Sequence, residues 1–115
     1  MTDSAIEQLL PLKAVDFHIL WVLSEGDLHG YGLVKEIEAR SDGHVMLEPG
    51  NLYRYVRRLV DEGLVEPGDR EAARTTGRRR RYYRATALGR KVLAAETARM
   101  RSVVDAVDMS LGSEV

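Results

Sequence analysis

The chain has 115 residues, so its length alone predicts one small domain and excludes a large multi-lobed enzyme. Hydrophobic residues make up 44% and charged residues 30% of the sequence, a balance that is ordinary for a soluble globular protein and argues against disorder. Cysteine is absent, which excludes disulfides, thiolate catalysis and cysteine-bound zinc. The longest apolar run, residues 19–23, is far shorter than the about 20 residues of a membrane span. We therefore expect a cytoplasmic protein with no membrane contact.

The formal net charge of −1 hides a strong segregation of charge along the chain. Residues 1–49 hold three basic and nine acidic residues, a net charge of −6, whereas residues 50–91 hold twelve basic and five acidic ones, a net charge of +7. A basic segment creates a local positive field that the charge of the whole chain does not report. Taken alone, the same run is also compatible with a solvated arginine-rich loop.

The first part of the chain predicts three helices. Residues 4–7 have the S-x-x-E form of a capping box, so a short helix should begin near Ser4 and end at Pro11. Apolar residues are nearly continuous over 12–23, which predicts a helix buried on most sides, in the core or at a subunit contact. After a turn, residues 31–40 place apolar side chains three and four positions apart and predict an amphipathic helix.

A further helix is predicted to begin at Pro49 and to end near Gly63. Its inner stripe is Leu52, Val56, Leu59 and Val60, and its outer stripe is Asn51, Arg54, Tyr55 and Arg58. Arginine can fork to guanine, asparagine to adenine, and tyrosine can reach a phosphate, so the outer stripe is suited to reading DNA. A solvated helix face would carry the same pattern.

The rest of the chain predicts a hairpin and a long helix. Residues 64–67 and 79–85 predict two strands around a polar tip, and the returning strand begins in a basic run made of Arg78, Arg79, Arg80 and Arg81. Tyr82 and Tyr83 alternate along that strand, so one should point inward and the other outward. Thr86 is expected to cap a last helix from Ala87 to about Met109, whose apolar spacing suits a helix–helix seam. We assign dimerisation to Val92, Met100, Val103, Val104 and Val107.

Helices followed by a hairpin and a helix predict a fold that is mainly α with a β-hairpin wing, a winged helix-turn-helix with a C-terminal dimerisation helix. Residues 1–86 would form the DNA-binding domain and residues 87–115 the dimerisation helix and tail, in one structural unit. In this fold the third helix of the core enters the major groove and the hairpin lies along the backbone or minor groove. The basic charge falls on these two elements, which favours double-stranded DNA as the partner.

Three sequence blocks resemble PadR-type transcriptional regulators. His29-Gly30-Tyr31 resembles the H-G-Y signature at the start of the second helix of that family. The block Gly50-Asn51-Leu52-Tyr53, with Arg58-Leu59 and Glu62-Gly63-Leu64, resembles the recognition-helix block G-T-L-Y…R-L…x-G-L. The block from Arg80 to Thr86, with Gly89, resembles the wing-to-helix block R-R-Y-Y-x-x-T-x-x-G. The resemblance covers roughly residues 12–110. Any one of these blocks is weak evidence for the family, but three of them in this order are specific to it.

The resemblance implies a homodimeric DNA-binding repressor, usually with an effector, in the subfamily with a short C-terminal region. It adds Tyr53 to the candidate DNA contacts and permits a small hydrophobic or aromatic effector near Phe17 and Trp21. Two departures matter. Glu48 stands where the family usually has a small capping residue, and Asn51 and Arg54 replace the common Thr and Pro of G-T-L-Y-P. The family's operator sequence therefore does not carry over.

Other kinds of site find little support in the sequence. The three histidines, His18, His29 and His44, have no paired spacing, so we expect no metal, and His29 is expected to fix the turn before the second helix. No nucleophile motif, paired carboxylates or phosphate-binding glycine loop stands out, so we expect neither enzyme activity nor a cofactor. One alternative remains, a winged-helix interaction module that applies its basic face to an acidic protein partner. An RNA-binding role is weaker because no stacking platform is visible.

Overall fold

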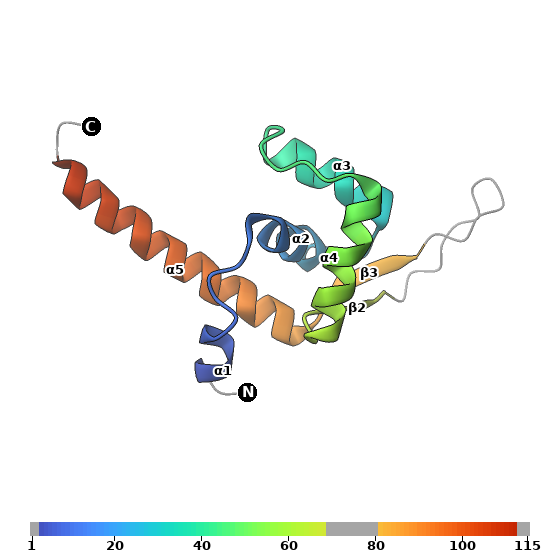
Figure 1. The fold of residues 1–115 in the computed structure, drawn as a ribbon. Helices are drawn as coiled ribbons and strands as arrows, with labels where there is room; N and C mark the ends of the chain where they lie inside the picture. The colour runs from blue at the N-terminus through green and yellow to red at the C-terminus, as the bar shows by residue number, and fades with distance from the viewer. Residues whose placement is uncertain (1–2, 69–80, 113–115) are drawn as a thin grey trace.

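The computed structural model describes residues 3–68 and 81–112 and shows a mainly helical protein with a small three-stranded sheet (Figure 1). The helices are α1 (Asp3–Glu7), α2 (Ala14–Ser24), α3 (Gly30–Arg40), α4 (Pro49–Asp61) and α5 (Ala87–Leu111). The strands are β1 (Leu28–His29), β2 (Val65–Pro67) and β3 (Tyr82–Ala85). This is the fold class expected from the sequence, with the long C-terminal helix included.

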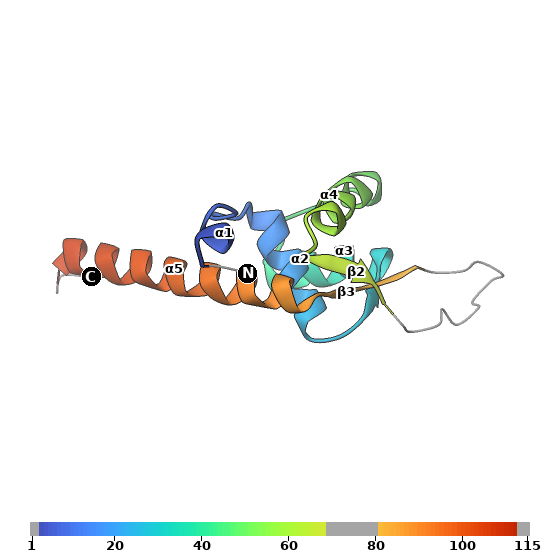
Figure 2. The same cartoon turned by 90° about the horizontal axis from the view of Figure 1, so that it is seen from below.

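Helix α2 occupies the centre of the molecule and contacts α3, α4, α5 and β3 (Figures 1 and 2). Its nearly continuous apolar sequence fits this position, because a helix surrounded by other elements has little surface left for water. Ile19, Leu20 and Leu23 of α2 are fully buried. The core also contains Ile6, Val22, Leu33, Val34, Ile37, Leu52, Val56, Leu59, Leu64, Val65, Ala85 and Val92.

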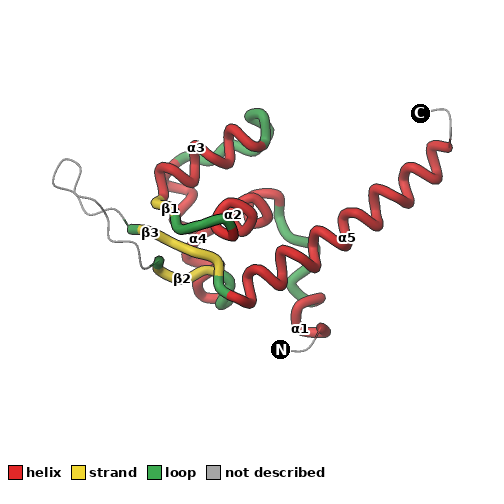
Figure 3. Tube along the Cα trace, turned by 180° about the vertical axis from the view of Figure 1, so that it is seen from behind, coloured by secondary structure: helices red, strands yellow, loops and turns green. Residues whose placement is uncertain are grey.

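The sheet is antiparallel, with β3 between β1 and β2 (Figure 3). Val65 of β2 lies opposite Ala85 of β3, and Leu28 of β1 lies opposite Tyr83 of β3. Strand β1 was not predicted, since its two residues are too few to show an alternating pattern. Its pairing joins the start of α3 to the base of the wing.

Side-chain caps fix two helix starts. The Gly32 amide donates to Nδ1 of His29, which confirms the expected role of His29 at the turn before α3. The Gly89 amide donates to Oγ1 of Thr86, so Thr86 caps α5 as expected. The Thr86 hydroxyl also donates to the Gly63 carbonyl at 2.6 Å, which ties the start of α5 to the end of α4.

Helix α5 changes character along its length. Its first half packs against α1, α2 and β3, whereas every residue from 101 to 111 is exposed. Figures 1 and 2 show this second half extending away from the rest of the molecule. Glu96 lies near the transition and is only 1% exposed, and its carboxylate accepts hydrogen bonds from the Leu12 amide and from Arg99.

Candidate nucleic-acid interface

Helix α4 presents one face to the core and the opposite face to solvent. Leu52, Val56 and Leu59 are at most 2% exposed, so they fix the rotation of the helix on α2 and α3. The exposed face carries Asn51, Tyr53, Arg54, Arg57 and Asp61. Asn51 and Arg54 thus point outward, as predicted, and Tyr53 is 57% exposed.

The predicted outer stripe is wrong at its other two members. Tyr55 is partly buried and packs against the core, and Arg58 pairs with Asp16 of α2, although 38% of its side chain remains exposed. The reason is geometric: with about 3.6 residues per turn, the direction opposite Leu52, Val56 and Leu59 runs through Arg54 and Arg57. Arg57 is an exposed cation that was not predicted for this face, although its spacing of three from Arg54 indicated it.

The Asp16–Arg58 pair joins α2 to α4 below the exposed face. The Asp16 side chain is 8% exposed, and its Oδ2 accepts a hydrogen bond from Nη2 of Arg58. Burial raises the pKa of the Asp16 carboxyl, while the charge and hydrogen bond of Arg58, and the charge of Lys13, act in the opposite direction. Oδ1 of Asp16 and Nε of Arg58 are buried and have no hydrogen-bond partner among the described residues.

Tyr55 supports the arginines on both sides of it. The Arg58 guanidinium carbon lies 5.5 Å from the centre of the Tyr55 ring, and the Arg54 guanidinium carbon lies 5.9 Å from it. Both distances fall within the range of cation–π attraction. Tyr55, which is itself partly buried, therefore limits where the Arg54 side chain can go.

A groove runs between α4 and the base of the wing. It is lined by Tyr53, Arg54, Val56, Arg57, Val60, Asp61, Pro67, Arg81 and Tyr83. Three arginines and one aspartate line it, so the groove is positively charged and would attract an anion such as a phosphate. Arg81 is exposed at its wing side, whereas Arg78, Arg79 and Arg80, which were also predicted to contact DNA, lie outside the described residues.

The two wing tyrosines face different neighbours. Tyr83 packs against the core and lines the groove, while the Tyr82 ring meets the His29 ring edge-on at 5.5 Å. Alternation along β3 separates them, as the period of two predicts. Both therefore have structural contacts at the base of the wing.

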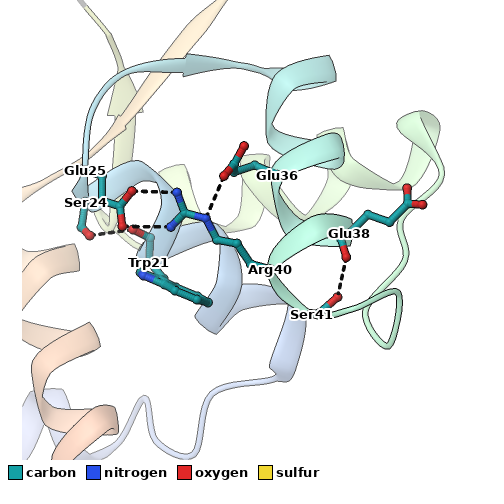
Figure 4. Close-up of polar contacts among 7 residues, drawn as sticks. All are labelled: Trp21, Ser24, Glu25, Glu36, Glu38, Arg40 and Ser41. Atoms are coloured by element: carbon teal, nitrogen blue, oxygen red, sulfur yellow. Dashed lines mark hydrogen bonds and ion pairs between the residues drawn. The ribbon is translucent and has the colours of Figure 1, made fainter.

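The residues expected near an effector form an aromatic cluster on one side of α2. Phe17, His18 and Trp21 are each partly exposed, and their rings are in contact in that order, with centres 5.9 Å and 5.8 Å apart. Figure 4 shows Arg40 above the Trp21 ring, where its guanidinium carbon lies 4.8 Å from the ring centre. Glu25 and Glu36 hold Arg40 in place by ion pairs, so one face of Trp21 is already covered.

The residues predicted for dimerisation divide into two groups. Val103, Val104 and Val107 are 48–57% exposed on the projecting half of α5, and Met100 is partly exposed. The assignment of Val92 to dimerisation is wrong, since Val92 is fully buried in the core and has no exposed surface for a partner. The sequence pattern did not distinguish the two because Val92 and Val103 belong to the same apolar series along one helix.

Residues 3–68 and 81–112 also bear on membrane spans and metal sites. No helix in these ranges is both long and apolar enough to cross a membrane. The same ranges contain no group of three or more His, Asp or Glu side chains placed to hold a metal ion.

Comparison with known proteins places this geometry in a family. Residues 19–95 match the model of the transcriptional regulator PadR-like family. The transcriptional regulator Rv3488 of Mycobacterium tuberculosis is 35% identical over 83 residues, which are 72% of each chain. A PadR family regulator from Clostridium difficile is similar in fold, with a TM-score of 0.70, 24% identity, and coverage of 87% of this chain and all of the other. Bacillus subtilis PadR, solved with operator DNA, has a TM-score of 0.62 and 22% identity over 72% of this chain and 46% of that one.

Proposed function

Because the chain belongs to the PadR-like family of transcriptional regulators, which are not enzymes, we propose that it is a homodimeric repressor that binds specific sites on double-stranded DNA. The observation that carries the proposal is the exposed face of α4, where Asn51, Arg54 and Arg57 stand beside the groove that Arg81 borders. A protruding polar helix next to a basic wing has the shape and charge that a major groove and its flanking phosphates require.

Within this surface we assign base contacts to Asn51 and Arg54, which lie in the first half of α4. The N-terminal part of a recognition helix goes deepest into the groove, and these two side chain types have bidentate partners on adenine and guanine. Arg57 and Arg81 line the groove and are assigned to phosphates, and Tyr53, which lines the same groove, is assigned to the DNA surface with them. The untested assignments of Arg78, Arg79 and Arg80 to phosphate remain part of the proposal.

Glu48 is the residue before α4, and its exposed side chain makes no capping hydrogen bond. A carboxylate there would face the phosphates if α4 enters the groove, and it would weaken binding to any DNA sequence. We infer that Glu48 lowers non-specific affinity more than it affects the choice of bases.

Dimerisation is proposed through the projecting half of α5. This half of the helix is exposed along its whole length and carries a row of half-exposed apolar side chains, Val103, Val104, Val107 and Leu111. Covering such a row with a second copy removes apolar surface from water. A two-fold dimer would present two α4 helices, and its DNA site would be a pair of half-sites related by symmetry.

An effector site is proposed at the aromatic surface of α2. Phe17 and Trp21 offer aromatic surface on α2, and a flat apolar molecule could stack on whatever area Arg40 leaves open. Binding there would act on the position of α3, since Arg40 belongs to that helix. The cytoplasm, where DNA and such small molecules meet, is the expected location.

The function is tested by selecting a duplex from a random pool and titrating the protein against that duplex and a scrambled version of it. The proposal predicts tight, salt-dependent binding with preference for the selected duplex, and a complex that contains two chains. Equal affinity for both duplexes would contradict specific recognition. Failure to bind either one would favour the alternative, an interaction module that uses its basic face on an acidic protein.

A further inference from the structure

Arg57 and Arg58 are neighbours in sequence with different surroundings. Arg57 is exposed and lines the groove beside the wing, whereas Arg58 points to the other side of α4 and pairs with Asp16. Composition alone would count both as DNA-binding cations. Their placement separates them into one cation that faces a groove and one that is held by a carboxylate.

The carboxylate that holds Arg58 is well protected from water. Asp16 lies in the first turn of α2, its side chain is 8% exposed, and Lys13 is the other charged group acting on it. Salt screens a buried pair much less than an exposed one, so the attraction persists under conditions in which surface pairs weaken. The Tyr55 ring adds a second contact on the guanidinium.

The pair is held by one carboxylate oxygen only. Oδ1 of Asp16 and Nε of Arg58 make no hydrogen bond among the described residues, and 38% of the Arg58 side chain is exposed. A second parallel hydrogen bond, as in a bidentate arginine–carboxylate pair, is absent from this contact. Arg58 is therefore fixed mainly by the charge of Asp16, and it lies close enough to the surface to move outward if that charge is removed.

We propose that Asp16 is a positioning residue that withholds Arg58 from the DNA backbone and thereby limits sequence-independent binding. The inference rests on the proposed function, since it concerns how the α4 surface binds DNA. With Arg58 held on α2, phosphate attraction along α4 comes from Arg57, and discrimination between sequences depends more strongly on Asn51 and Arg54. Removing the Asp16 charge would release Arg58 as an additional phosphate contact.

The test compares neighbouring variants by their salt dependence on a random-sequence duplex. Each phosphate contact contributes about 0.9 to the slope of log affinity against log salt. Arg57→Gln should flatten the slope by about that amount for each bound subunit. Arg58→Gln, which keeps an N–H donor for Asp16, should leave the slope unchanged.

Asp16→Asn completes the comparison. It should steepen the slope by about 0.9 for each bound subunit, and the double variant Asp16→Asn/Arg58→Gln should return the slope to that of the unmodified protein. A purely structural role for Asp16 would change stability without this reversal. Thermal unfolding of each variant identifies any that does not fold, and equal flattening by Arg57→Gln and Arg58→Gln would overturn the inference even if Asp16→Asn did not fold.

Two results would overturn the inference. Equal flattening by Arg57→Gln and Arg58→Gln would show that Arg58 already contacts a phosphate. An unchanged slope in folded Asp16→Asn would show that its charge does not restrain Arg58. Failure of the unmodified protein to bind any duplex is a different result, because it contradicts the proposed function itself.

Discussion

At the scale of single residues, the stability of the fold depends on two charged side chains that are buried. Asp16 and Glu96 are both buried, and each faces an arginine that remains partly exposed. A buried charge is costly unless it is paired, so these contacts are the places where one substitution should have a large effect. Hydrophobic periodicity does not reveal them, since it describes which side chains are apolar and says nothing of which polar ones find partners.

Glu96 gives a pH-dependent prediction. Hydrogen bonds from Arg99 lower the pKa of the Glu96 carboxyl, with help from the Leu12 amide and the Arg99 charge, and they outweigh burial, which acts the other way. The ionised Glu96 carboxylate contributes its full stabilisation of the folded state above the ordinary glutamate pKa of about 4.3. This contribution is lost as the pH falls through the lowered pKa of the folded state.

Glu96→Gln should therefore reduce the free energy of unfolding at neutral pH by about 1–3 kcal/mol. The difference from the unmodified protein should shrink as the pH falls below about 4. Urea unfolding of both proteins at a series of pH values measures this difference directly. A difference that stays constant across the series would contradict the assigned ion pair.

At the scale of elements, the close approach of α5 to the end of α4 gives a second prediction. A Cβ atom at Gly89 would lie 2.1 Å from the Leu64 carbonyl oxygen, a backbone atom that cannot swing away. Gly89→Ala should lower the free energy of unfolding by about 3 kcal/mol or prevent folding, in the upper range of overpacking effects. Gly26→Ala is the matched control, since nothing lies within 4 Å of its added Cβ. Equal stability of the two variants would show that α5 does not pack on Leu64 as described.

The projecting half of α5 gives the third prediction. Replacing Val103 and Val107 together by Asp should yield monomers and weaken binding to the selected duplex, because charge would be placed in the proposed seam. Val92→Asp is not an equivalent change, since Val92 lies in the core and its replacement should unfold the chain. Light scattering at micromolar concentration reports the mass, and a monomeric unmodified protein would reject the proposed dimer.

The elements show what the sequence could and could not predict. Capping residues and apolar spacing predicted the order of the helices and of the hairpin. Thr86 and His29 cap their helices as expected. Strand β1 was missed because pairing with β3, not local pattern, defines it. The predicted outer stripe of α4 included Tyr55 and Arg58 in place of Arg57, although the helical spacing of Leu52, Val56 and Leu59 already pointed to Arg54 and Arg57. The pairing of Arg58 with Asp16, far away in the sequence, had no local signal.

At the scale of the whole molecule, function follows from where charge is placed and not from its total. The net charge is −1, yet Arg54, Arg57 and Arg81 gather on one surface, and much of the acidic charge lies in the first 49 residues. DNA phosphates would attract the arginine surface and repel the acidic regions, so the protein would approach DNA with the arginine surface first. The sequence predicted this segregation well, since it needs only the positions of charges along the chain.

The most direct measurement of the central claim is a titration of Arg54→Ala against the selected duplex and its scrambled version at one fixed salt concentration. Lys91→Ala, which removes an exposed cation from α5, is the matched control. If α4 reads bases, Arg54→Ala should weaken the selected site by about 1–3 kcal/mol, weaken the scrambled duplex much less, and relax preference at one base position. An equal loss on both duplexes would make Arg54 a backbone contact, and no change on either would show that α4 does not dock on DNA.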